Sequence, residues 1–379
     1  MGNMKSYYDY LDEFVYDLPH GKEREKGIRR AINAALEENN YGAALDLYHE
    51  FTEEAVFYDD SYEGLIILPE YTALFDKHPE LWARRNYDLM ISYKWLSDDY
   101  SAFYQIPLEQ IERMMQNYAS LCDRFGYNKR SYYQCVFDLI QDMGMDLVLN
   151  GMTLQEAHDL MFKCNRDAIS DCRACEADTM IMHIFALEKD KNKAILTALK
   201  TAKPLFTGKL SCTEVPQVTY ARFAEYFLKS GIWDEAELMA DKAWRIFSRK
   251  DVNSPALANF EGYVMLVYAY TNTKKALSVL KKSLPVCWNI KNSVLSWDYY
   301  YGFYHIMKQL EEEGKRSVVL NFPDKNAAFY SESNNYATLD LKQYAFDKLI
   351  FLSENLDRRN GNTFYSDRLK DTFQDTADE

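Results

Sequence analysis

The chain has 379 residues, a length that allows two or three domains. It carries 44 basic and 58 acidic side chains, so its net charge is −14, and this acidity disfavours binding to bare nucleic acid, which needs clustered cations. Apolar residues make up 47% of the chain, which argues against intrinsic disorder, and the low numbers of Gly (14) and Pro (9) argue against a turn-rich all-β fold.

The N-terminal segment and the cysteines predict a cytoplasmic protein. Residues 1–14 contain no continuous apolar core, so we expect no secretory signal. No run of 18 apolar residues occurs, so we expect no membrane span. Seven cysteines in such a chain are interpreted as reduced thiols. Residues 1–6 also fit the N-myristoylation pattern, and an ordinary start is the simpler interpretation.

Helical periodicity runs from about residue 22 to about residue 357, with Gly and Pro mostly between the periodic segments. Residues 58–79 are ambiguous because Pro69 and Pro79 interrupt them, and residues 321–335 are predicted to form a loop. The expected helical segments, in chain order, are 27–51, 80–96, 107–125, 145–164, 182–198, 218–247, 264–280, 294–313 and 336–357.

Residues 218–247 form the clearest helix–turn–helix unit. Ala224 and Ala236 are placed where two antiparallel helices would approach most closely, since a larger side chain there would separate the backbones. Gly231 is predicted to end the first helix in the left-handed conformation. Large rings, such as Phe227 and Trp233, would fill the space around this crossing.

This spacing resembles the tetratricopeptide repeat, a helix–turn–helix unit. The matching positions are Tyr220, Phe223, Ala224, Phe227, Gly231, Trp233, Ala236, Ala240 and Ala243. The closing proline of the family is replaced by Ser248. Degenerate copies are marked by a second-helix alanine, at Ala44, Ala157, Ala194 and Ala276, and Asn39 takes the turn position in the first copy.

The resemblance implies an all-α fold, a right-handed superhelix (α-solenoid) of about seven to eight antiparallel helix pairs. We expect a single tetratricopeptide-like domain over residues 22–357, an N-terminal cap segment over residues 1–21 and a flexible acidic tail over residues 358–379. A non-repetitive helical bundle is the alternative.

In tetratricopeptide proteins the first helix of each pair lines a concave face, and the resemblance assigns residues to it. These are Asp142, Asp146, Glu176, Thr179, His183, Glu225, Glu261 and Tyr268, with Arg29 and Asn33 in the first copy. Five of the first eight are carboxylates, which would favour a basic partner. The hypothesis is that this face binds a polypeptide with basic or aromatic anchors. The chain's overall acidity would also place several acids there by chance.

The predicted function is therefore a non-enzymatic scaffold or sensor that binds a protein or peptide. One alternative is an immunity-type inhibitor that masks a basic toxin or nuclease. A second is an enzyme, or an enzyme subunit, with an unrecognised site. We expect no enzyme activity and no cofactor, because the standard hydrolase, NTPase and dinucleotide motifs do not occur.

Cys172 and Cys175 form the only Cys-x-x-Cys motif. The neighbouring candidates for further metal ligands are His158, Cys164 and His183. A zinc site normally shows a second such pair, so packing is the favoured interpretation of these cysteines and metal binding the alternative. The tyrosine runs at residues 7–10, 132–133 and 299–304 are likewise interpreted as packing, with a partner surface as the alternative.

Overall fold

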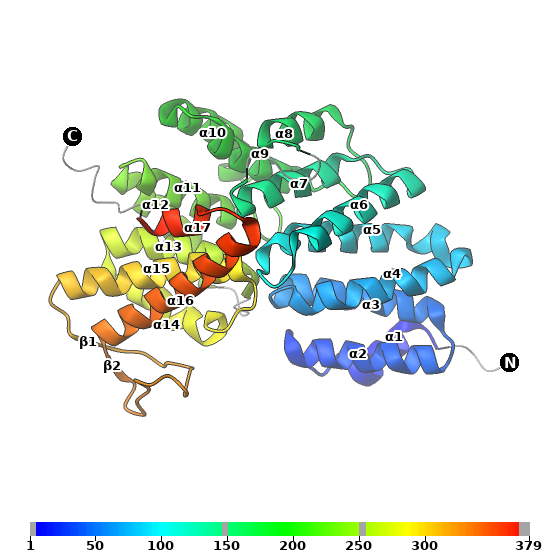
Figure 1. The fold of residues 1–379 in the computed structure, drawn as a ribbon, viewed down its shortest axis with the longest axis horizontal. Coiled ribbons are helices and arrows are strands. Elements are labelled where there is room, and N and C mark those ends of the chain that lie inside the picture. Colours follow the sequence, from blue (N-terminus) through cyan, green and yellow to red (C-terminus); the bar gives the residue numbers. More distant parts are fainter. Residues whose placement is uncertain (1–4, 146–150, 250–254, 371–379) are drawn as a thin grey trace. The chain divides into compact units, whose positions relative to one another are not determined.

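The computed structural model describes residues 5–145, 151–249 and 255–370 (Figure 1). The chain forms two compact units. Unit 1 comprises Met1–Asp142 and Asp146–Ser170, and unit 2 comprises Met143–Met145 and Asp171–Glu379. The predicted groove residue Asp146, most of the myristoylation motif and residues 371–379 of the predicted tail lie outside the described residues.

The described residues form seventeen α-helices, three short 3₁₀ helices and one two-stranded sheet, which confirms the predicted all-α class. The strands are β1 (Ser317–Val319) and β2 (Asn335–Ala337), and they pair antiparallel at the ends of the predicted 321–335 loop. No described helix carries an apolar stretch long enough to cross a membrane.

Unit 1 contains the first eight helices, and its segment 58–79 is mainly helical despite Pro69. The elements are α1 (Tyr7–Phe14), α2 (Lys22–Glu37), α3 (Tyr41–Tyr58), α4 (Tyr62–Lys77), η1 (Pro79–Leu81), α5 (Trp82–Asp99), η2 (Tyr100–Ala102), α6 (Leu108–Phe125), α7 (Arg130–Met143) and α8 (Leu154–Lys163). The last residue of α7, Met143, belongs to unit 2.

Unit 2 contains the remaining helices, and residues 358–370 of the predicted tail form the end of one helix and the whole of the next. The elements are α9 (Arg173–Leu187), α10 (Lys191–Phe206), α11 (Gln217–Lys229), α12 (Trp233–Phe247), η3 (Pro255–Leu257), α13 (Ala258–Thr271), α14 (Thr273–Cys287), α15 (Ser293–Glu312), α16 (Thr338–Asn360) and α17 (Phe364–Lys370).

Within each unit, the principal helix packing joins helices that are next or next but one in the chain. In unit 2, α11 packs on α12 and α13, and α13 packs on α14 and α15. The odd-numbered helices α9, α11, α13 and α15 therefore form a continuous row, in which each helix contacts the next (Figure 1).

In the unit formed by α11 and α12 the predicted small residues and the Phe227 ring are buried, whereas Trp233, predicted to fill the crossing, is 39% exposed. Ala224, Ala236, Ala240 and Ala243 are all fully buried. Gly231 follows α11 with a φ of +76°, in the left-handed region that glycine favours. In unit 1, Asn39 ends α2 with a φ of +56°, as its predicted turn position requires.

In unit 2, α13 and α15 cross in close backbone contact at Gly262 and Gly302. A Cβ atom on Gly262 would collide with the backbone carbonyl of Asp298, and one on Gly302 would collide with the carbonyl of Gly262. The absence of side chains at both positions therefore lets the two backbones touch. This contact fixes Asp298 on the side of α15 that faces α13.

Candidate functional site

Five of the residues predicted to line a groove are buried, and three of these five are His183, Glu261 and Tyr268. His183 on α9 is fully buried. Glu261 on α13 is 4% exposed, and its carboxylate accepts a hydrogen bond from the Cys287 thiol at 3.5 Å. Tyr268, also on α13, is buried and donates its hydroxyl to Asp241 at 2.6 Å. These side chains therefore pack inside unit 2.

The other predicted groove residues differ in exposure. Glu176 is buried at the first turn of α9 and is paired with the Arg173 guanidinium at 3.3 Å. Glu225 on α11 is half-buried and forms an ion pair with Lys229 at 2.6 Å. The remaining positions are Thr179 (buried, α9), Asp142 (half-buried, α7), Arg29 (half-buried and paired with Glu70, α2) and Asn33 (exposed, α2). Glu176, His183, Glu225, Glu261 and Tyr268 thus all lie on helices of the odd-numbered row, whereas Asp142 belongs to unit 1.

The same row of helices holds a half-buried arginine from α17, Arg368. The Arg368 guanidinium donates to the Asp298 carboxylate on α15 at 2.9 Å. The guanidinium carbon also lies 4.0 Å from the centre of the Trp297 ring. The other oxygen of Asp298 accepts a hydrogen bond from the Tyr263 hydroxyl on α13 at 3.1 Å. We call this group, with Glu225 of α11, the Arg368 site.

Charge complementarity stabilises the Arg368 site. Burial alone would lower the pKa of Arg368, but the carboxylates of Asp298 and Glu225 and the nearby phenols outweigh burial and raise the pKa. Burial raises the pKa of Asp298, and the positive charge of Arg368 opposes that rise. The predicted groove residue Glu225 therefore acts together with Asp298, a residue that the sequence analysis did not select.

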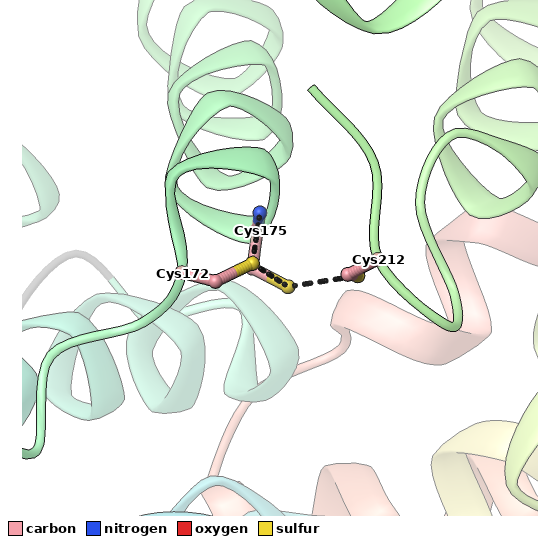
Figure 2. A group of neighbouring side chains, drawn as sticks. All are labelled: Cys172, Cys175 and Cys212. Carbon is pink, nitrogen blue, oxygen red and sulfur yellow. Dashed lines mark hydrogen bonds between the residues drawn. The ribbon is translucent and has the colours of Figure 1, made fainter. Parts of the chain in front are cut away.

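A second cluster in unit 2 joins the Cys-x-x-Cys motif to a third cysteine (Figure 2). The sulfurs of Cys172 and Cys175 are 3.4 Å apart, and those of Cys175 and Cys212 are 3.3 Å apart. All three sulfurs lie within 4.8 Å of one another. Cys172 is exposed, whereas Cys175 and Cys212 are half-buried. Within residues 5–145, 151–249 and 255–370, this is the only group of three or more Cys, His, Asp or Glu side chains whose ligand atoms lie this close together.

The start of α9 positions the first two thiols. Cys172 is the N-cap residue, with extended backbone, and its sulfur accepts the Cys175 backbone N–H at 3.4 Å. A thiol here replaces the usual capping oxygen, and the helix N-terminus favours negative charge. Burial acts to raise the pKa of Cys172, but hydrogen bonds from Cys175 and its neighbours together lower it. Burial and the two neighbouring thiols raise the pKa of Cys175.

The loop between α10 and α11 positions the third thiol. The Cys212 backbone N–H donates to the Val215 carbonyl at 3.0 Å, which closes a turn. Val215 is buried, and the next helix begins two residues later at Gln217. α9 also packs on both α10 and α11, so the loop between them is held close to the start of α9.

The sequence analysis did not select Cys212, because 37 residues separate it from Cys175 and no local spacing connects them. Of the candidates that it did select, His158 and Cys164 belong to unit 1 and His183 is buried farther along α9. One signal in the sequence could have identified Cys212. The number of cysteines is odd, and this one lies in a turn between two predicted helices.

The tyrosine runs are mainly packed, as predicted, with one exposed ring. Tyr299, Tyr300 and Tyr301 are at most 9% exposed. In the N-terminal run Tyr10 is fully buried, whereas Tyr8 is 63% exposed. An open cleft of about 570 Å³ in unit 1 is lined partly by Tyr8.

No protein-family model matches the chain, and neither a curated protein nor a solved structure shows a significant similarity to it. The tetratricopeptide resemblance therefore depends on the residues and spacings described above.

Proposed function

We propose that the chain is a non-enzymatic, tetratricopeptide-like scaffold that binds a basic or aromatic polypeptide segment along its row of odd-numbered helices. The packing of the helices supports this architecture. In unit 2 the odd-numbered helices contact one another in series, whereas the principal packing of α12 and α14 is with their chain neighbours. Closer packing in one row than in the other curves a stack of helix pairs and creates a concave face.

The Arg368 site is the observation that carries the proposal for the partner. Side chains of α11, α13 and α15 surround one arginine with an acidic and aromatic environment. Arginine suits such a site, because its planar guanidinium binds a carboxylate and stacks on an indole at the same time. The face that we propose for a partner therefore already accommodates a basic and aromatic segment of the chain itself, α17.

A peptide experiment tests whether this face recognises such a segment. A chain that ends at Gly361 would be mixed with a fluorescent peptide of residues 362–379, and binding would be measured by anisotropy. We expect binding, and at least a tenfold loss when the peptide carries Arg368→Ala, because that change leaves the buried Asp298 carboxylate without its cation, which costs about 3–5 kcal/mol. A truncated chain that is folded by circular dichroism but binds both peptides equally would contradict the proposal.

A charge-reversal experiment then tests the natural partner. The wild-type chain, Glu225→Lys and Glu235→Lys would each be used to capture proteins from the native host, and each captured protein would be retested in purified form. Glu235 is an exposed residue of α12 and provides the matched control, because both variants change the net charge equally. A true partner should be captured by the wild-type chain and by Glu235→Lys, but not by Glu225→Lys. Equal retention by all three chains would contradict the acidic-face proposal.

A further inference from the structure

We propose that Cys172, Cys175 and Cys212 bind one zinc ion through their three sulfur atoms. This site is independent of the proposed scaffold function. The proposal depends on the convergence of three thiols from two separate segments, the start of α9 and the α10–α11 loop (Figure 2). Once deprotonated, three neighbouring thiols are a soft, anionic ligand set of the kind that zinc prefers.

The sulfur positions fit this ion with small movements. A Zn–S distance of about 2.3 Å with tetrahedral angles separates two sulfur ligands by roughly 3.8 Å. The sulfur of Cys175 lies 3.4 Å from that of Cys172 and 3.3 Å from that of Cys212. Each pair therefore needs to move apart by about half an ångström to admit the ion. The exposure of Cys172 leaves the fourth tetrahedral position open to water.

The charge of the site is also favourable. Zinc displaces the three thiol protons to solvent and forms a Zn(S–Cys)₃ centre with a net charge of −1. The first turn of α9 stabilises this negative charge through its backbone N–H groups, including the Cys175 N–H that already donates to the Cys172 sulfur. Bound zinc would therefore link the beginning of α9 to the α10–α11 loop.

A disulfide is the competing use of the same residues. Oxidation of Cys172 and Cys175 would remove both thiol hydrogens, pass two electrons to an external oxidant and leave Cys212 outside the bond. The third thiol, which contacts this pair, favours the metal. A zinc ion would use all three sulfur atoms, whereas a disulfide between Cys172 and Cys175 would leave Cys212 without a role.

Zinc titration of the reduced full-length chain, in competition with a chromophoric chelator, tests the proposal. We expect one zinc ion per chain and at least ~100-fold weaker binding in Cys212→Ser and Cys172→Ser, since losing even an outer-sphere partner costs 10–100-fold. Cys164→Ser, a half-exposed cysteine outside the cluster, is the matched control and should bind like wild type. Cobalt substitution should give a thiolate charge-transfer band that weakens in Cys212→Ser.

Several results would overturn the zinc site. One is zinc binding that Cys212→Ser leaves unchanged while circular dichroism shows a folded chain. Another is a reduced wild-type chain that binds no zinc but, after exposure to air, loses the mass of the thiol hydrogens of Cys172 and Cys175. That second result would assign the cluster to redox chemistry.

Discussion

Glu25 on α2 provides the sharpest test of the energetics of unit 1. It is 4% exposed, and its Oε1 has no hydrogen-bond partner among the described residues. Burial, together with the negative charges of Asp59, Glu63 and other acids, raises its pKa from 4.5 to about 8. The neighbouring cation, Arg24, lies beside Glu54 instead, at 3.5 Å. We therefore expect that Glu25→Gln stabilises the protein at neutral pH.

The magnitude follows from proton linkage. The unfolded chain releases the Glu25 proton near pH 4.5, whereas the folded chain retains it until about pH 8. Stability is therefore lost as the pH rises between these values, by at most about 1.4 kcal/mol per pH unit. The upper limit at pH 7 is about 3 kcal/mol, and relaxation around the carboxylate reduces it, so we expect a gain of about 1–3 kcal/mol for Glu25→Gln.

The assay is urea unfolding of wild type and Glu25→Gln at pH 5, 6, 7 and 8, followed by far-ultraviolet circular dichroism. The stability difference should be small at pH 5 and should grow steadily towards pH 8. Glu37→Gln, at an exposed position of the same helix, is the control and should change stability little at any pH. A difference between Glu25→Gln and wild type that is independent of pH, or a less stable variant at pH 7, would refute the reasoning.

Three further predictions concern unit 2. Gly262→Ala should destabilise the protein by about 1–3 kcal/mol in urea unfolding, because the added methyl group collides with α15, although Gly→Ala inside a helix ordinarily stabilises it. Arg368→Met should leave Asp298 as an unpaired buried charge, costing about 3–5 kcal/mol and increasing hydrogen exchange in α17. Glu261→Gln should raise the melting temperature more at pH 8 than at pH 5, because burial raises the pKa of Glu261 to about 7 and the folded state loses stability as the pH rises from 4.5.

The sequence predicted the local features of the fold well, because these depend on residues close together in the chain. The small residues Ala224 and Ala236 are fully buried in the α11–α12 unit, and Gly231 and Asn39 have the positive φ angles that their turns require. Only part of the cysteine cluster was identified from the sequence, namely the Cys172–Cys175 motif without Cys212. The Cys172–Cys175 spacing is visible in one helix turn, but Cys212 joins it through a tertiary turn that has no fixed spacing from α9.

The exposure of the predicted groove residues was harder to predict, and α13 shows why. The spacing indicates which side of a helix a residue occupies, but not how many neighbours cover that side. α13 packs on α11, α12, α14 and α15, and it is apolar almost all round, as a fully enclosed helix must be. Glu261 and Tyr268 therefore lie inside the protein, on whichever side of α13 the repeat pattern places them.

The row of helices nevertheless has an acidic and aromatic site where a second segment meets it. Asp298 lies beside the α13–α15 contact at Gly262, so the same close backbone approach that buries α13 also places this carboxylate opposite Tyr263. α17 then supplies the compensating cation, Arg368. Because a buried carboxylate at this position requires a positive partner, any segment that replaces α17 must also present a cationic side chain.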